Sequence, residues 1–286
     1  MTDSIGIFGL GLIGASLAGR LLAAGNAVRG YDPDAGRVSL FEEGGGVAVD
    51  PGAVWRSDIV FSAVFDTDQL ERLIDAAPHG TGGILVSMST CDPERMAALE
   101  ARAKQKGWIL CEAPVSGTSA QLASGEAVFF IAGDAAATKR LSPLFAALGR
   151  AHFDLGAIGN GNRAKLVINL ILGLNRAALA EGLVFAERLG LDPAAVLHLA
   201  QNSAAHSQVM ATKGPLMVAG SFEAQGRVSQ SLKDFAIIQN LAQSKNQRLP
   251  FAEIYQDMLK DCLDHAEGDF DNSAIILAIA RARAEA

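Results

Sequence analysis

Short apolar runs alternate with longer amphipathic segments in the first half of the chain. Runs rich in β-branched and other apolar residues predict strands at residues 5–8, 27–31, 58–64, 83–86, 108–111 and 127–131. Apolar residues at helical spacing predict helices at residues 12–24, 34–43, 68–77, 93–106 and 135–148. Thr67 and the pair Asp92-Pro93 offer N-caps for two of them. This alternation is typical of βαβ units on a parallel sheet, so the fold class predicted for this half is α/β.

The pattern changes after about residue 154. A glycine-rich stretch at residues 156–161 is followed by sequence rich in Ala, Leu, Glu, Gln and Arg, without a convincing strand. One helix is predicted over residues 162–189, ended by Gly190 and about 42 Å long at 1.5 Å per residue. Shorter helices are predicted at residues 193–202, 228–244, 250–265 and 272–284. We therefore predict an α/β domain over residues 1–158 and an all-α domain over residues 159–286, joined by the long helix.

Composition and net charge limit the classes of molecule that this protein is expected to bind. The chain has 286 residues, of which 50% are hydrophobic, enough to bury a core in each domain. Its net charge of −7 has the wrong sign for a protein that follows a nucleic-acid backbone or an anionic membrane surface. The most lipid-like run, residues 166–174, is far shorter than the roughly 20 residues that span a bilayer. These features favour a small-molecule partner over nucleic acid or a membrane.

The cysteines and histidines predict neither a disulfide framework nor a metal site. Cys91, Cys111 and Cys262 are odd in number and far apart, which fits a reducing cytoplasm. No basic residue precedes Arg20, whereas a secretory signal needs a positive N-terminal region. The five histidines show no paired metal-ligand spacing. A cytoplasmic, metal-independent protein is therefore predicted.

A complete GxGxxG motif directly follows the first predicted strand and opens the first predicted helix. Its members are Gly9, Leu10, Gly11, Leu12, Ile13 and Gly14. The first glycine permits a tight turn, the second lets the backbone approach a pyrophosphate, and the third lets helix and strand pack closely. Free N–H groups at a helix start attract anions. The motif in this setting predicts dinucleotide binding at these six residues.

Asp32 lies at the end of the second predicted strand, where an acidic side chain can accept hydrogen bonds from the adenosine ribose. A 2′-phosphate would face the Asp32 charge, so the position favours NAD. Arg37 is close enough to leave NADP possible. The alternative is that Asp32-Pro33-Asp34 only caps the helix that follows.

Two further groups of residues could carry chemistry. Lys165 and Asn169 are four apart near the start of the long helix and so share one face. Desolvation there would lower the lysine pKa and suit it to proton transfer, although a lysine in a first helical turn is usually a solvated surface charge. Ser116, Gly117, Thr118 and Ser119 gather hydroxyl and N–H groups that could hold a carboxylate, or could simply form an N-cap.

Taken together, these residues resemble the β-hydroxyacid dehydrogenases, typified by 3-hydroxyisobutyrate dehydrogenase and tartronate semialdehyde reductase. The resemblance covers essentially the whole chain and rests on five blocks in the family's order. They are Gly9 to Gly14, Ser87-Met88-Ser89-Thr90-Cys91-Asp92-Pro93, Glu112-Ala113-Pro114-Val115-Ser116-Gly117, residues 159–169 (GNGNRAKLVIN), and Lys233-Asp234-Phe235. The resemblance implies a Rossmann-like N-terminal domain, an all-helical C-terminal domain and an active site in the cleft between them.

The resemblance also assigns roles to individual residues. It implies that Lys165 is the catalytic proton-transfer residue and that Asn169 orients the substrate beside it. Ser116 and Gly117 would hold the substrate carboxylate, with Thr118 next to them in the substrate site. The remaining residues would contact the cofactor: Val64 and Phe65 on the nicotinamide side, and Thr90 and Lys233 against cofactor or substrate.

The chain departs from the family's usual pattern at three places. Thr118 stands where the family usually has a second glycine, and it adds bulk and a hydroxyl at the substrate position. Phe65-Asp66 replaces a frequent Leu-Pro in the loop assigned to the cofactor, and Glu112 stands where Asp is common. Imine reductases of the same fold usually lack the lysine, so Lys165 argues against that branch.

The leading hypothesis is an NAD-dependent oxidoreductase that transfers a hydride between nicotinamide and a small 3-hydroxyacid, or reduces the matching semialdehyde. The alternatives are an NADPH-dependent aldehyde or imine reductase and a non-catalytic NAD-binding sensor. The helical half has apolar runs at residues 170–174 and 275–279 beyond what one thin layer needs, so a homodimer or homotetramer is predicted.

Overall fold

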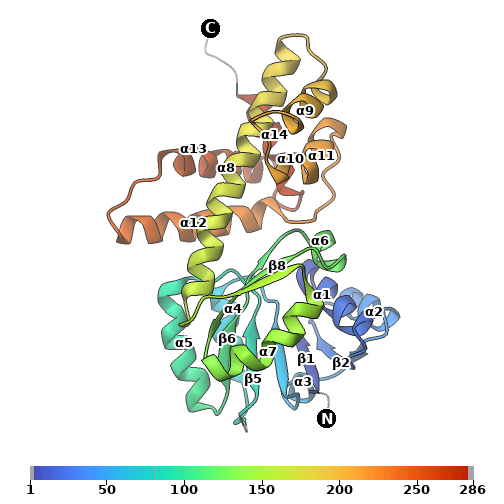
Figure 1. The fold of residues 1–286 in the computed structure, drawn as a ribbon, viewed down its shortest axis with the longest axis vertical. Helices are drawn as coiled ribbons and strands as arrows, with labels where there is room; N and C mark the ends of the chain where they lie inside the picture. The colour runs from blue at the N-terminus through green and yellow to red at the C-terminus, as the bar shows by residue number, and fades with distance from the viewer. Residues whose placement is uncertain (1–2, 81, 283–286) are drawn as a thin grey trace. The chain divides into compact units, whose positions relative to one another are not determined.

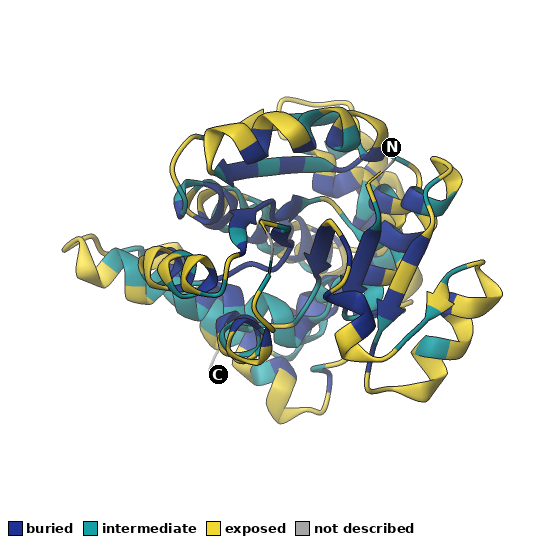
Figure 2. Ribbon diagram, turned by 90° about the horizontal axis from the view of Figure 1, so that it is seen from below, coloured by how far each residue is buried: buried dark blue, intermediate teal, exposed yellow. Residues whose placement is uncertain are grey.

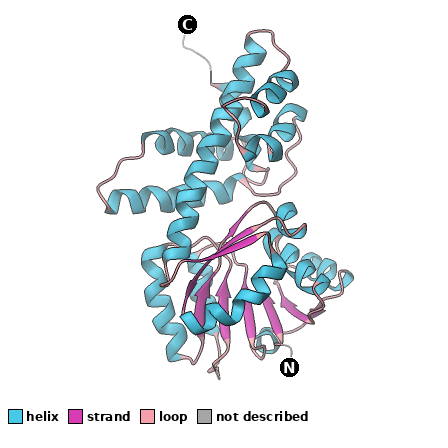
Figure 3. Ribbon diagram, in the orientation of Figure 1, coloured by secondary structure: helices cyan, strands magenta, loops and turns pink. Residues whose placement is uncertain are grey.

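The computed structural model describes residues 3–80 and 82–282. These residues form two compact units, and the division falls between Lys165 and Leu166. Strands are confined to the first unit, apart from an isolated bridge in the second, as Figure 3 shows for the described residues. An α/β unit followed by a helical one is the predicted fold class.

The first unit is built on one sheet (Figure 1). Its strands are β1 (Ile5–Phe8), β2 (Val28–Tyr31), β3 (Val47–Ala48), β4 (Ile59–Ser62), β5 (Ile84–Ser87), β6 (Ile109–Glu112), β7 (Val115–Ser116), β8 (Val128–Gly133) and β9 (Ala151–Asp154). Its helices are α1 (Leu12–Ala23), α2 (Ala35–Glu43), α3 (Pro51–Val54), α4 (Thr67–Ala76), α5 (Pro93–Gln105), α6 (Ser119–Ala123) and α7 (Ala135–Leu148).

The strand order is β3-β2-β1-β4-β5-β6-β8-β7, with β9 beside β8. Strands β1 to β6 are parallel, and β8 runs antiparallel to β6 and β7. The first six strands thus have the order of a dinucleotide-binding Rossmann fold, in which ligands bind at the carboxyl ends of the strands where the order reverses. Here that switch point lies between β1 and β4, directly where the glycine motif begins.

Alternate residues of the strands pack on opposite faces of the sheet. On β1, Ile5 and Ile7 join a core with α1, α2, α6 and α7, whereas Phe8 joins a second core with α3, α4 and α5. On β4, Phe61 and Val60 divide in the same way. The strands are therefore buried on both sides, as the dark central sheet in Figure 2 shows, and the connecting loops are left to carry the site.

The second unit consists of helices. They are α8 (Asn160–Arg188), which begins within the first unit, then α9 (Pro193–Gln201), α10 (Gln208–Thr212), α11 (Gly214–Ala219), α12 (Val228–Ser244), α13 (Pro250–Asp264), the 3₁₀ turn η1 (Asn272–Ala274) and α14 (Ile275–Arg281). Its core contains Leu179 and Leu183 of α8, Phe235 of α12 and Tyr255 of α13. The rings of Phe235 and Tyr255 pack with their centroids 4.5 Å apart.

The predicted strands and helices are present, with ends displaced by up to two residues except in the last predicted helix. That helix begins as the 3₁₀ turn η1, and its α-helical part, α14, starts at Ile275 and ends at Arg281. Residues 283 and 284 of the last predicted helix lie outside the described residues. One predicted cap was wrong: Asp66, not Thr67, caps α4 by accepting from the Gln69 N–H at 2.7 Å. Thr67 instead accepts from the Asp92 N–H at 2.9 Å and so ties the starts of α4 and α5 together.

Candidate functional site

The glycine motif forms a tight turn between β1 and α1. Gly9 has φ +88°, and a Cβ there would lie 2.6 Å from the carbonyl oxygen of Ala63. A Cβ at Gly14 would collide with the carbonyl of Gly9, so both positions require glycine. Helix α1 starts without a side-chain cap, since its N-cap residue is Gly11. The backbone N–H groups of its first turn are therefore available to an anion, which is the geometry that a dinucleotide pyrophosphate needs.

Asp32 is attached to this turn by its side chain. Its Oδ2 accepts from the Leu10 N–H at 2.7 Å, and its Oδ1 accepts from the Asp34 N–H at 2.9 Å. The guanidinium of Arg37 lies 3.4 Å from Oδ2. The helix cap that the sequence offered as an alternative role belongs to Asp34, which accepts from the Arg37 N–H at 3.1 Å. Asp32 is thus placed beside the turn, as the ribose role requires, and also supports the turn.

The loops after β4 and β5 meet at the same edge of the sheet. The Val64 carbonyl accepts a hydrogen bond from the Ser89 hydroxyl at 2.6 Å. The N–H of Phe65 donates to the Gln69 side chain at 2.9 Å, and the Phe65 side chain is 42% exposed. Thr90 is buried in the second of these loops. The structure therefore brings Val64, Phe65 and Thr90 to the strand ends next to the glycine motif.

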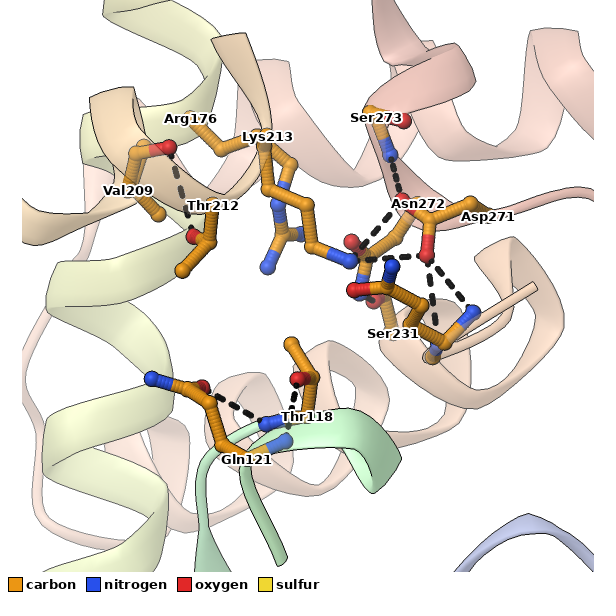
Figure 4. Close-up of polar contacts among 12 residues, drawn as sticks. Thr118, Gln121, Arg176, Val209, Thr212, Lys213, Ser231, Asp271, Asn272 and Ser273 are labelled. Carbon is orange, nitrogen blue, oxygen red and sulfur yellow. Dashed lines mark hydrogen bonds and ion pairs between the residues drawn. The ribbon is translucent and has the colours of Figure 1, made fainter. Parts of the chain in front are cut away.

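The segment at Ser116 leads from β7 into α6. Gly117 has φ +141°, and Thr118 is the N-cap of α6. Thr118 and Gln121 form a capping box: the Thr118 hydroxyl accepts from the Gln121 N–H at 3.1 Å, and Gln121 Oε1 accepts from the Thr118 N–H at 2.9 Å (Figure 4). The box engages the Thr118 N–H and one lone pair of the Thr118 hydroxyl, and Ser116 is half-buried just before the turn.

A buried carboxylate holds the start of α8. Glu112, at the end of β6, is fully buried and accepts from the Gly161 N–H at 2.7 Å. The side chain of Asn162 also donates to Glu112, and its Oδ1 accepts from the Cys91 N–H at 2.7 Å. Burial raises the pKa of Glu112, and the hydrogen bonds from Asn162 and Gly161 oppose that rise. These contacts fix the first turn of α8 against the ends of β5 and β6.

Lys165 lies one turn after this anchored start. Lys165 is 7% exposed, so it is buried as the sequence predicted. Because Glu112 and Asn162 hold the preceding turn, the position of the Lys165 backbone is set by buried hydrogen bonds rather than by solvent-exposed contacts.

Asn169, one turn further along α8, has partners within the helical unit. Its Nδ2 donates to Asp234 Oδ2 on α12 at 2.8 Å. The ammonium of Lys233 lies 3.0 Å from the other oxygen of Asp234. Asp234 thus connects two residues that the sequence singled out, Asn169 and Lys233, and it fixes which way the Asn169 amide is turned.

Sequence reasoning missed the supporting residues Glu112, Asn162 and Asp234 as partners. Asn162 bonds to Glu112 across 50 positions, and Asn169 bonds to Asp234 across 65. No local pattern marks such pairs. The available signal was that all three lie inside the blocks that carry the family resemblance.

Comparisons with known proteins agree with this arrangement. A model of the NAD-binding domain of 6-phosphogluconate dehydrogenase matches residues 4–159, and a model for NAD-binding of NADP-dependent 3-hydroxyisobutyrate dehydrogenase matches residues 159–279. The chain is 32% identical to the probable 3-hydroxyisobutyrate dehydrogenase-like 1, mitochondrial, of Arabidopsis thaliana, over 97% of this chain and 85% of that protein. It is 29% identical to the chloroplastic glyoxylate/succinic semialdehyde reductase 2 of the same plant, over 99% of this chain and 81% of that protein. The fold is similar to that of 3-hydroxyisobutyrate dehydrogenase from Salmonella typhimurium, with a TM-score of 0.89 at 24% identity, over 96% of this chain and 99% of that one.

Proposed function

Since the chain belongs to the β-hydroxyacid dehydrogenase family, we propose that Lys165 is the proton-transfer residue of an NAD(P)-dependent oxidoreductase that interconverts a small 3-hydroxyacid and the matching semialdehyde. The observation that carries the role of Lys165 is its burial one turn after the start of α8, which Glu112 and Asn162 anchor.

The first unit fits a nicotinamide dinucleotide. Gly9, Gly11 and Gly14 shape the turn, and the uncapped start of α1 supplies N–H groups for the pyrophosphate. When bound, the cofactor supplies or accepts the hydride at nicotinamide C4. Val64, Phe65 and Thr90 lie on loops at the same sheet edge, and the family resemblance assigns them, with Lys233, to contacts with the cofactor.

NAD is the preferred cofactor in this proposal. Asp32 carries a buried negative charge beside the glycine turn, which would accept hydrogen bonds from ribose hydroxyls and repel a 2′-phosphate. Arg37 supports the alternative of an NADPH-dependent reductase, because its guanidinium reaches Asp32 and lies near Gly11. Measuring the affinities for NADH and NADPH separates the two.

Lys165 moves the proton that accompanies hydride transfer. In reduction its ammonium donates a proton to the carbonyl oxygen while the carbonyl carbon receives the hydride. In oxidation the neutral amine accepts the hydroxyl proton as the carbon loses its hydride.

The substrate is held by its carboxylate and its hydroxyl. The resemblance assigns the carboxylate to Ser116 and Gly117, with Thr118 beside them. Asn169 Nδ2 is engaged by Asp234, so Oδ1 is the atom that Asn169 turns to a substrate hydroxyl. The capping box uses the N–H of Thr118 and one lone pair of its hydroxyl, so Thr118 offers the substrate its O–H donor and the bulk of its side chain.

The test is nicotinamide absorbance with NAD or NADP and a panel of 3-hydroxyacids, comparing wild type with Lys165→Ala. We expect the variant to lose at least about a thousandfold in kcat while its NADH affinity stays within about threefold. Lys139→Ala, at an exposed position on α7, is the control and should keep full activity. Substantial turnover by Lys165→Ala would refute the assignment, and tight NADH binding without turnover of any hydroxyacid by the wild type would instead favour a non-catalytic sensor.

We also propose that the protein acts in the cytoplasm on small molecules. The three cysteines are buried free thiols, as a reducing compartment allows. Burial raises the pKa of Cys111 and of Cys262 to about 12, so both are poor nucleophiles and structural rather than reactive.

A further inference from the structure

Two buried cations face one carboxylate in the core of the helical unit. Lys213 follows α10 and is 3% exposed, and Arg176 on α8 is 8% exposed. The carboxylate is that of Asp271, just before η1, which is fully buried. Figure 4 shows the Arg176 guanidinium and the Lys213 ammonium side by side, with Asp271 on the far side of the lysine.

Asp271 is saturated by partners other than Arg176. The Lys213 ammonium donates to its two oxygens at 2.9 and 2.7 Å. The backbone N–H groups of Gln225, Gly226 and Ser273 donate to it at 3.0, 3.2 and 3.0 Å. Burial opposes ionisation of Asp271, but these donors and the charge of Lys213 outweigh it and lower its pKa. One lysine and three backbone amides therefore occupy the Asp271 carboxylate.

Arg176 is left without a counter-charge among the described residues. Its Nη1 donates to the phenol oxygen of Tyr255 at 2.7 Å, and its buried Nε makes no hydrogen bond. Burial raises the pKa of Tyr255, so that partner is neutral. Burial lowers the pKa of Lys213, and the Asp271 carboxylate opposes that lowering. The positive charge of Arg176 lowers the pKa of Lys213 further, because the two cations are close enough to repel each other.

A buried guanidinium without an anion is costly. Buried charges in folded proteins are normally paired, because removing an ion from water costs several kcal/mol. Guanidinium is always protonated and presents planar N–H pairs that match the oxygens of a carboxylate or phosphate. The unpaired Arg176, with Lys213 beside it, therefore has the chemistry of an oxyanion-binding site.

The phase of α8 relates this site to the proposed catalytic residue. At 100° per residue, Arg176 is within about 20° of Lys165 around the helix axis and Asn169 within about 40°. Arg176 lies about 16 Å beyond Lys165 along the axis, and helical side chains lean back toward the N-terminus. Lys165, Asn169 and Arg176 thus form one polar stripe along α8.

We propose that Arg176, supported by Lys213, binds an acid group of the substrate whose hydroxyl Lys165 and Asn169 face from the same helix. This inference rests on the proposed function. It makes the substrate a 3-hydroxyacid that carries a second carboxylate or a phosphate, rather than one with a neutral tail.

The binding step is tested on the full-length protein by titration calorimetry with malonate and, separately, with inorganic phosphate. We expect Arg176→Met to weaken binding of the preferred anion roughly 10- to 100-fold. Arg188→Met, the same change at an exposed position in the last turn of α8, should bind as the wild type does. Arg176→Lys keeps the charge and should recover part of the affinity.

Thermal melting shows whether Arg176→Met is folded, so that a loss of anion binding is not mistaken for a loss of structure. Because Arg176→Met removes an uncompensated buried charge, it should melt at or above the wild-type temperature without anion and lose the rise in Tm that malonate or phosphate gives the wild type. A large fall in its Tm together with unchanged anion binding would show that Arg176 is structural and overturn the proposal.

Kinetics test whether the anion belongs to the substrate. The comparison uses 3-hydroxybutyrate, 3-hydroxyglutarate and 4-phosphorylated 3-hydroxybutyrate, whose tails are neutral, carboxylate and phosphate. We expect the wild type to favour one of the two acid tails in kcat/KM, and Arg176→Met to lose at least tenfold of that preference, whereas Arg188→Met should keep it. Anion binding that depends on Arg176 without any such preference would overturn the substrate assignment and indicate a free anion. Lys165→Ala separates the two proposals, because it should lose turnover of all three compounds and keep the anion affinity.

Discussion

At the scale of single residues, Asp32 shows how one carboxylate can serve both fold and ligand. It accepts from the backbone of Leu10 in the glycine turn and from Asp34 at the start of α2. Each of its oxygens can accept further hydrogen bonds, so a ribose can bind without displacing these partners. In the function proposed above, the residue that selects the cofactor therefore also fixes the glycine turn.

We expect Asp32→Ser to weaken NADH binding roughly 10- to 100-fold and to shift the NADH to NADPH ratio toward NADPH, with Arg37 then free to meet a 2′-phosphate. Fluorescence titration with both reduced cofactors measures the shift. Asp34→Ser is the matched control: it alters the cap of α2 at a small cost in stability and should leave the ratio unchanged. An unaltered ratio in Asp32→Ser would contradict the ribose role.

At the scale of elements, the start of α8 depends on a residue from β6. Glu112 accepts from the N–H groups of the first helical turn, where a negative charge is also favoured by the helix dipole. A Cβ at Gly161 would lie 3.0 Å from Glu112 Oε1, so the glycine permits the close approach. Glu112 thus holds the helix backbone one turn before Lys165, and in the proposed function it is a positioning residue.

We expect Glu112→Gln to lower kcat at least tenfold and to lower the free energy of unfolding by about 1–3 kcal/mol. The reason is that the glutamine side chain can turn its NH₂ group toward the NH₂ group of Asn162, so that two donors face each other and the hydrogen bond is lost. Denaturant unfolding and steady-state kinetics measure the two effects. NADH affinity should be nearly unchanged, and Glu112→Asp, which keeps the carboxylate, should recover part of kcat. Glu126→Gln, at an exposed position, should change neither quantity.

The same variant carries a pH dependence with a definite sign. The folded pKa of Glu112 is raised above its ordinary value of 4.5, mainly by burial. The folded chain then holds this proton more tightly than the unfolded chain, so the stability that Glu112 contributes is largest at low pH and declines as pH rises from 4.5 through the folded pKa. The stability gap between wild type and Glu112→Gln should narrow in that direction. A gap that widens with pH would contradict the raised pKa.

How far the sequence predicted the molecule depends on whether a feature is local. Strands such as β1 and helices such as α7 follow from periodicity, and the glycine motif places the cofactor turn. The two-residue strands β3 and β7 are too short to show alternation, and β9 exists because β8 pairs with it. The short helices α10 and α11 were not predicted either, since each spans less than two turns.

The candidate site divides in the same way. Motifs mark Lys165, Asn169 and Asp32 as candidates, and these roles stay predictions. The hydrogen bonds of Glu112 and Asp234 were identified only by the structure. The buried pair of Lys213 and Asp271 spans 58 positions and lies in no motif. Pairs of this kind are set by tertiary packing, which single-sequence patterns do not encode.

At the scale of the whole molecule, α8 has one polar side and one exposed apolar side. Opposite the stripe of Lys165, Asn169 and Arg176, Val167, Ile171 and Phe185 lie within about 40° of one another around the axis. Their exposed fractions are 57%, 50% and 63%. In length and mean hydropathy, 1.4 in its most apolar window, α8 also satisfies the criteria for a membrane span, and 28% of that window is buried. Leu166, Leu179 and Leu183 of the same helix nevertheless belong to the core of the helical unit.

A second copy of this chain is the partner that we propose for this apolar face. Exposed apolar stripes of this kind normally mark an interface, and self-association is the commonest way in which soluble proteins cover one. We expect light scattering at micromolar concentration to show a homodimer or homotetramer, and the double variant Ile171→Asp and Phe185→Asp to shift it toward monomer. Leu40→Asp, equally apolar and 68% exposed but on α2 of the first unit, should leave the assembly intact. A monomeric wild type would contradict the proposal, and an unchanged assembly in the double variant would move the interface away from α8, since two buried unpaired carboxylates could not be accommodated there.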